Sequence, residues 1–151
     1  MAPKPPPQGP RMFTVEEAND LVPILEMAFG HLGRLRTEAS RLVEALGGGD
    51  QAMAVLKGGA PGPGLEPHAR RFRAVVEEIN AVVEQVNGMG CLVKDIDTGL
   101  VDFHGVLDGD PVLLCWQFGE PAVVHWHPLG EGFASRRPIE GVSLTPPTFP
   151  N

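Results

Sequence analysis

Five side chains that can bind a metal ion lie within one short stretch of the chain, residues 101–127. They alternate with large apolar residues along three predicted strands, at Asp102, His104, Cys115, His125 and His127. A strand presents successive residues to opposite faces, so a meander of these strands places all five on one face of a sheet. Thiolate, imidazole and carboxylate groups are ligands that transition metals such as zinc use in proteins. The spacing therefore predicts a transition-metal site on this face.

The pairing of the first two strands follows from a turn at Asp108-Gly109. A two-residue hairpin favours this dipeptide because both central positions need a positive φ. The turn places Asp102 opposite Cys115. Two residues closer to the turn, His104 lies opposite Leu113. A slip of one residue would exchange the two faces, so this pairing decides whether the candidate ligands meet.

The pairing of the second and third strands follows from a row of apolar residues that continues across the break at residues 119–121. A continuous row requires Phe118 to pair with Ala122. Cys115 then lies opposite His125. The same register gives one further pair, Leu113 and His127.

A single ion can take ligands from only part of this set. Residues that face each other across neighbouring strands have Cβ atoms ~5 Å apart, but Asp102 and His125 flank Cys115 from opposite sides. The expected ligands are Cys115, His125 and His127, with His104 or Asp102 completing the coordination. Such donors predict Zn, Fe or Cu as the ion. Three charged residues are expected to support the ligands or pair with nearby charges, namely Glu120, Glu131 and Arg136.

Two other interpretations of this face are open. The polar face could lie in solvent or against another subunit, with Cys115 serving only as a small packing residue. A Cys115–His125 pair could instead act as a thiol hydrolase, in which the histidine accepts the thiol proton. The position of Asp102 disfavours the hydrolase, because Asp102 lies on the far side of the cysteine and cannot orient that histidine. Whether the protein is an enzyme stays open.

Two amphipathic helices precede these strands. A capping box of Thr14 and Glu17 starts the first, which is predicted over residues 14–46. The second is predicted over residues 66–88, and both carry apolar residues at every third or fourth position. A connection rich in glycine and proline joins them over residues 47–64. Two such helices indicate an antiparallel helical hairpin of coiled-coil type.

The expected fold is therefore α+β, with the long helical hairpin followed by a small antiparallel β-meander of three to four strands. A chain of 151 residues has room for one domain with a modest core. We expect this domain to span residues 12–139, with the sheet over 91–127 and an irregular cover over 128–139. Proline-rich tails flank it at residues 1–11 and 140–151.

The charge and the cysteine content exclude several classes of protein. The net charge of −7, from 19 acidic and 12 basic residues, argues against binding nucleic acid or an anionic membrane. Two cysteines do not make a disulfide framework, and no secretory leader is recognisable, so we expect a cytosolic protein. No apolar run approaches the ~20 residues of a membrane helix. The long flanks of the hairpin predict a homo-oligomer, most simply a dimer.

Five strings of this sequence are long and specific: Phe13-Thr14-x-Glu16-Glu17-Ala18-Asn19, Gly90-Cys91-x-Val93-Lys94-Asp95-x-Asp97-x-Gly99-Leu100-Val101-Asp102-Phe103, Leu114-Cys115-Trp116-x-x-Gly119-Glu120, His125-Trp126-His127 and Glu131-Gly132-Phe133-Ala134-x-Arg136. In these strings the chain resembles a bacterial family known as domain of unknown function 2203, over residues 13–138 except the helix connection. The resemblance implies no activity, because the family has none assigned. It implies hallmark residues on the face predicted above, namely Asp102, Cys115, Glu120, His125 and His127.

The leading hypothesis is a small cytosolic protein that binds a transition-metal ion through a Cys/His/Asp site on one face of the sheet. The alternative is a non-enzymatic protein that forms oligomers or binds a partner through the helical hairpin. Neither hypothesis names a small-molecule substrate.

Overall fold

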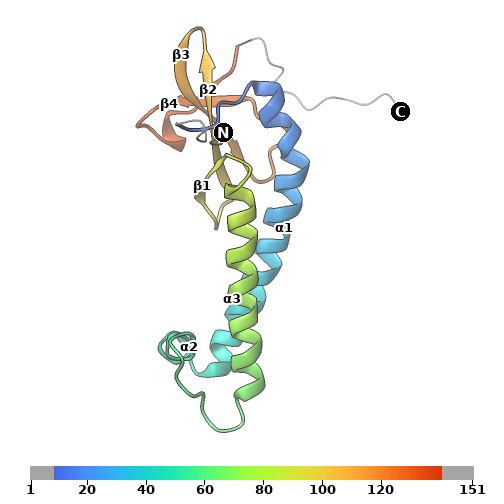
Figure 1. Ribbon diagram of the computed structural model, residues 1–151, viewed down its shortest axis with the longest axis vertical. Coiled ribbons are helices and arrows are strands. Elements are labelled where there is room, and N and C mark those ends of the chain that lie inside the picture. Colours follow the sequence, from blue (N-terminus) through green and yellow to red (C-terminus); the bar gives the residue numbers. More distant parts are fainter. Residues whose placement is uncertain (1–8, 141–151) are drawn as a thin grey trace, which may run out of the picture. The chain divides into compact units, whose positions relative to one another are not determined.

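Helices occupy the first part of the described chain and strands the second. A computed structural model describes residues 9–140 (Figure 1). The helices are α1 (Val15–Leu46), α2 (Gly49–Leu56) and α3 (Glu66–Asn87), followed by the 3-10 helix η1 (Phe133–Ser135) among the strands. The strands are β1 (Leu92–Asp95), β2 (Leu100–Leu107), β3 (Asp110–Gln117), β4 (His125–Pro128) and β5 (Arg137–Pro138).

The predicted α+β class is confirmed, with two differences in detail. The sheet has five strands instead of three to four, because β5 forms within the segment that was expected to be an irregular cover. The connection between the long helices, predicted to be flexible apart from a helical turn at residues 51–56, contains an eight-residue helix, α2. The predicted tails, residues 1–11 and 140–151, fall largely outside the described residues.

The described chain divides into two compact units. Residues 26–86 form a helical unit, and residues 9–25 together with 87–140 form a sheet unit. The long helix α1 contributes its first residues to the sheet unit and the rest to the helical unit.

In the helical unit, α1 and α3 run side by side as a hairpin (Figure 1). The predicted apolar spacing fills its core, which consists of Leu35, Leu42, Leu46, Ala52, Val55, Ala69, Phe72 and Val75. On the surface of the unit, Arg71 binds both carboxylate oxygens of Glu38. The additional helix α2 contributes Ala52 and Val55 to this core, so burial of apolar side chains accounts for its presence in the glycine-rich connection.

The start of α1 is fixed by the predicted capping box. The Thr14 side chain accepts from the Glu17 amide at 3.0 Å, and the Glu17 side chain accepts from the Thr14 amide at 3.0 Å. These two bonds satisfy donors that a helix terminus otherwise leaves without a partner. Immediately before the helix, the Phe13 amide donates to the His104 carbonyl of β2 at 2.7 Å, which ties the helix entry to the sheet.

The sheet is an antiparallel meander in the order β1-β2-β3-β4-β5. The predicted turn between β2 and β3 is confirmed, with φ of 52° at Asp108 and 83° at Gly109. The predicted pairs are confirmed as well: Asp102 with Cys115, His104 with Leu113, Cys115 with His125, and Leu113 with His127.

The predicted pair of Phe118 with Ala122 does not form. The β3 strand ends at Gln117 and β4 starts only at His125, so a longer turn separates them. Glu120 closes this turn, because its side chain accepts from the Gln117 amide at 2.7 Å and its carbonyl accepts from the Trp116 indole at 3.0 Å. Side-chain hydrogen bonds thus replace the last strand pairs.

The centre of the sheet is buried on both faces. One face carries Val101, Phe103, Leu114 and Trp116, and Phe13 packs on Phe103 with ring centroids 5.1 Å apart. The opposite face carries the candidate ligands, and its central residues are buried as well. Among the described helices, none is long and apolar enough to cross a membrane.

We expect Gly105→Ala to destabilise the fold by about 1–3 kcal/mol, because an added Cβ would lie 3.0 Å from the Phe13 carbonyl oxygen and 3.2 Å from the Leu114 side chain. Gly33→Ala in α1 is the matched control, since its Cβ meets nothing within 4 Å. The control should stabilise the protein by ~0.5–1 kcal/mol, because alanine favours the helix. Urea denaturation followed by circular dichroism measures both, and equal effects would contradict the packing described.

Candidate functional site

Three adjacent strands bring an acid, a thiol and an imidazole together. Asp102 of β2, Cys115 of β3 and His127 of β4 each offer a ligand atom, and these atoms lie within 4.8 Å of one another. All three residues are buried, with exposed fractions of 2%, 0% and 1%. The interpretation of this face as an open polar surface therefore fails at its centre. We refer to these three residues as the Asp/Cys/His cluster.

Each ring nitrogen of His127 faces an oxygen atom. Its Nδ1 lies 3.0 Å from the Pro128 carbonyl, which can only accept, so Nδ1 carries a proton. Its Nε2 lies 3.0 Å from Oδ2 of Asp102. In metal-binding histidines one ring N–H commonly donates to a backbone carbonyl in this way, which leaves the other nitrogen for the ion.

The other oxygen of Asp102 lacks a partner. Among the described residues, two buried side-chain polar atoms form no hydrogen bond, Asp102 Oδ1 and Arg136 Nε. Both residues act on the neighbouring thiol. Burial, followed by the negative charge of Asp102, raises the pKa of Cys115 to about 12, and Arg136 opposes this shift. A hydrogen bond between the thiol and the Asp102 carboxylate also raises this pKa. The cluster therefore combines a buried carboxylate, of which Oδ1 has no hydrogen-bond partner among the described residues, with a thiol that stays protonated at neutral pH.

This geometry disfavours the thiol hydrolase further. A catalytic histidine needs one nitrogen for the acid and the other for the nucleophile. The Nδ1 of His125, the histidine of that hypothesis, already accepts from Arg136. The two ring nitrogens of His127 face Asp102 and a backbone carbonyl, so neither is left for Cys115. The raised pKa and the burial of this thiol also oppose a reactive thiolate.

A second polar cluster adjoins the first. The Arg136 guanidinium donates to both carboxylate oxygens of Glu120, at 2.7 and 2.8 Å, and to Nδ1 of His125 at 2.9 Å. Burial and the positive charge of Arg136 lower the pKa of His125, so this histidine is neutral near pH 7. The Nδ1 lone pair of His125 accepts from Arg136, so this nitrogen cannot also bind an ion at the Asp/Cys/His cluster.

The sequence prediction and the structure thus select different members of one face. Cys115 and His127 lie together, as expected. The third member of the cluster is Asp102, whereas the sequence favoured His125. The reason is that the His127 side chain reaches across β3 to Asp102. His104 lies partly exposed on the same face outside the cluster, and Glu131 lies exposed beyond β4. Glu120 and Arg136 pair with each other.

Asn19 is a structural residue of the site that the reasoning from residue types missed. Its side-chain amide accepts from the Val123 amide at 2.7 Å and donates to the Val123 carbonyl at 3.3 Å. It thereby fixes the backbone that leads into β4, two residues before His125. The only signal for Asn19 in the sequence was its place in the string that resembles a known family.

The fold and the site define a class of protein: an α+β protein whose antiparallel sheet encloses a buried Asp/Cys/His cluster. Residues 11–139 match the family described as uncharacterized conserved protein (DUF2203). The chain belongs to this family, which confirms the resemblance found in its sequence. No curated protein and no solved structure matches the chain.

Alkylation tests the description of the thiol. In protein treated with a chelator, we expect iodoacetamide at neutral pH to modify Cys115 much more slowly than after denaturation in guanidinium, because the thiol is buried and its pKa is raised to about 12. Peptide mass spectrometry separates it from Cys91, a second buried thiol with a raised pKa that should be protected in the same way. Selective, rapid labelling of Cys115 would contradict this description and favour the hydrolase.

Proposed function

We propose that this protein binds one transition-metal ion through Asp102, Cys115 and His127. The observation that carries the proposal is the buried Oδ1 of Asp102, which lies beside a thiol and an imidazole and has no hydrogen-bond partner within residues 9–140. A buried carboxylate oxygen without a donor is costly, and a bound cation would remove this cost. The Nε2 of His127 and the Oδ2 of Asp102 lie 3.0 Å apart, a spacing that also suits two ligand atoms of one cation.

The donor set and its spacing fit this proposal. Ligand atoms around a tetrahedral zinc ion lie about 3–4 Å apart, since the bonds to the ion are ~2.0–2.3 Å long. The cluster spans at most 4.8 Å, so small side-chain adjustments suffice. Thiolate and imidazole favour Zn, Fe or Cu over Ca or Mg. Binding would deprotonate Cys115, and one divalent ion with two anionic ligands leaves no net charge in the buried site.

Three protein ligands leave one position of a tetrahedral ion unfilled, but the burial of all three restricts access to that position. Catalytic zinc sites keep a position open to water or substrate, whereas structural sites are closed. Each proposed ligand exposes 2% of its surface or less, so we assign no reaction to the site. Thiolate coordination also agrees with a reducing compartment, and we propose the cytosol as the location.

Elemental analysis of protein purified without a histidine tag or chelator tests the proposal. We expect about one equivalent of Zn, Fe or Cu in the wild type. The variants Asp102→Asn, Cys115→Ser and His127→Gln should each lose it, because each removes a donor with little change of volume. Circular dichroism shows whether a variant still folds, and titration of the folded variants with Zn²⁺ separates weak binding from no binding.

Three matched variants serve as controls for the metal measurement. His104→Gln and Cys91→Ser change the same residue types outside the cluster and should keep the ion. His125→Gln distinguishes the ligand set of the structure from the set that the sequence favoured, and we expect it to keep the ion as well. A folded wild type that is purified without metal and takes up none on titration would disprove the proposed function.

A second candidate function is self-association through the helical unit. Met27 exposes 77% of its surface there, and Met53 and Leu56 of α2 are exposed as well. Exposed apolar side chains that form a contiguous patch often mark protein interfaces. We expect light scattering after size exclusion to detect a dimer that Met27→Gln weakens, with unchanged metal content. Met12→Gln changes an exposed methionine of the sheet unit and is the control. A monomeric wild type would exclude this function.

A further inference from the structure

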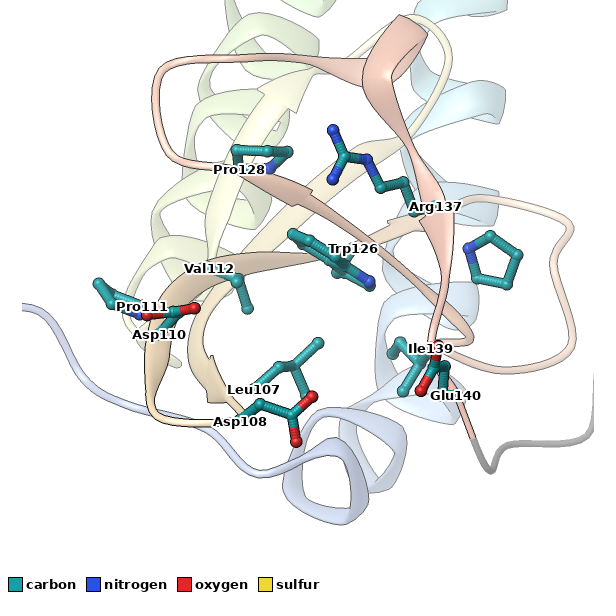
Figure 2. Close-up of a pocket in the computed structure, with 11 residues that line it drawn as sticks. Leu107, Asp108, Asp110, Pro111, Val112, Trp126, Pro128, Arg137, Ile139 and Glu140 are labelled. Atoms are coloured by element: carbon teal, nitrogen blue, oxygen red, sulfur yellow. The ribbon is translucent and has the colours of Figure 1, made fainter.

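An open groove lies on the face of the sheet opposite the Asp/Cys/His cluster. Figure 2 shows Trp126 of β4 at its centre. Trp126 lies between His125 and His127 in the strand, so the pleat directs it to the other face. The groove has a volume of about 1110 Å³ and is formed by the β2–β3 hairpin, β4, β5 and the residues after β5. It therefore exceeds most small-molecule sites, which measure ~300–1,000 Å³.

The floor of the groove is apolar and aromatic. Val112 and Ile139 are buried beneath it, while Leu107 and Trp126 are partly exposed. The Arg137 guanidinium lies 5.2 Å from the centroid of the Trp126 ring. A partly exposed indole between small apolar side chains offers a flat surface on which the rings of a ligand can pack.

The rim of the groove is acidic. Asp108 and Asp110 flank the hairpin turn on one side, and Glu140 follows β5 on the other. These three carboxylates outnumber the one cation among the lining residues, Arg137. All four side chains are exposed, so they attract a cationic ligand without a large desolvation cost.

The backbone beside the groove cannot accept an added strand. The edge strand β5 has only two residues, and one of them is Pro138, which has no amide to donate. The next amide, that of Ile139, already donates to the Val124 carbonyl at 2.9 Å. A peptide in this groove must therefore be held by its side chains, and a polyproline II helix is the backbone form that needs no hydrogen bonds from a sheet edge.

We propose that this groove binds an extended, proline-rich peptide that carries lysine or arginine. The proline rings pack on Trp126 and the neighbouring apolar side chains. The basic residue pairs with the carboxylates of Asp108, Asp110 and Glu140. The groove shares no lining residue with the proposed metal site, whose ligands lie on the opposite face of the sheet.

Isothermal titration calorimetry of the full chain with a synthetic Lys-Pro-Pro-Pro repeat peptide tests the proposal. We expect saturable binding that 0.5 M salt weakens, because exposed charges are screened. A Lys-Gly-Gly-Gly repeat has the same charge without the proline rings, and should not bind measurably. Equal binding of both peptides would mean that charge alone is recognised and would overturn the proposal.

Variants locate the binding on the protein. Asp108→Asn with Asp110→Asn should weaken the proline-rich peptide about fivefold, since two exposed charge pairs are lost. Asparagine tolerates the positive φ of position 108, so this variant keeps the turn. Asp20→Asn with Glu84→Gln removes the same charge from exposed helix positions and should change nothing. Equal affinities of the two double variants would disprove the assignment to this groove.

Trp126→Leu tests the floor of the groove. It should abolish measurable binding while the circular dichroism spectrum is unchanged. Amide shifts in nuclear magnetic resonance spectra of the wild type give a readout that needs no variant. They should change at residues 107–112, 126–128 and 137–140 on peptide addition, and shifts confined to other residues would overturn the proposal.

Discussion

The register of β2, β3 and β4 is the constraint on which the rest of the structure depends. Side chains alternate along each strand, so a slip of one residue at the Asp108-Gly109 turn would exchange the face of Asp102 with that of Phe103. The turn prevents the slip because its two central residues hold a positive φ that this dipeptide tolerates. The cluster on one face and the apolar core on the other both follow from this single choice.

The two faces of the sheet bury side chains of different polarity. One face buries aromatic and aliphatic residues such as Phe103 and Trp116. Removing their apolar surface from water is favourable by itself. The other buries an acid, a thiol and an imidazole, which is unfavourable unless each polar atom finds a partner. The free Oδ1 of Asp102 and the raised pKa of Cys115 mark where this requirement is not met by the described residues alone. A cation at this position would satisfy it.

Polar side-chain contacts, in addition to the pairing of β4 with β5, hold the segments on either side of β4. Glu120 accepts from Arg136. The Asn19 side chain of α1 accepts from the Val123 amide and donates to the Val123 carbonyl. Together they bring an irregular turn and the chain after η1 to the edge of the buried cluster. Arg136 also occupies the Nδ1 lone pair of His125, so His127 is the histidine of β4 that lies at the Asp/Cys/His cluster.

The sequence by itself determined the two long helices, the hairpin turn and the pairs across β2, β3 and β4, because capping, apolar spacing and turn chemistry are local and the pleat then fixes the faces. It also determined that Asp102, Cys115 and His127 share a face. It placed a further pair, Phe118 with Ala122, where hydrogen bonds of Glu120 formed a turn instead. Only the tertiary structure decided that His127 reaches across β3 to Asp102, that Arg136 engages His125, and that Trp126 faces an open groove. These outcomes depend on side-chain contacts between segments far apart in the chain, and no local pattern encodes such contacts.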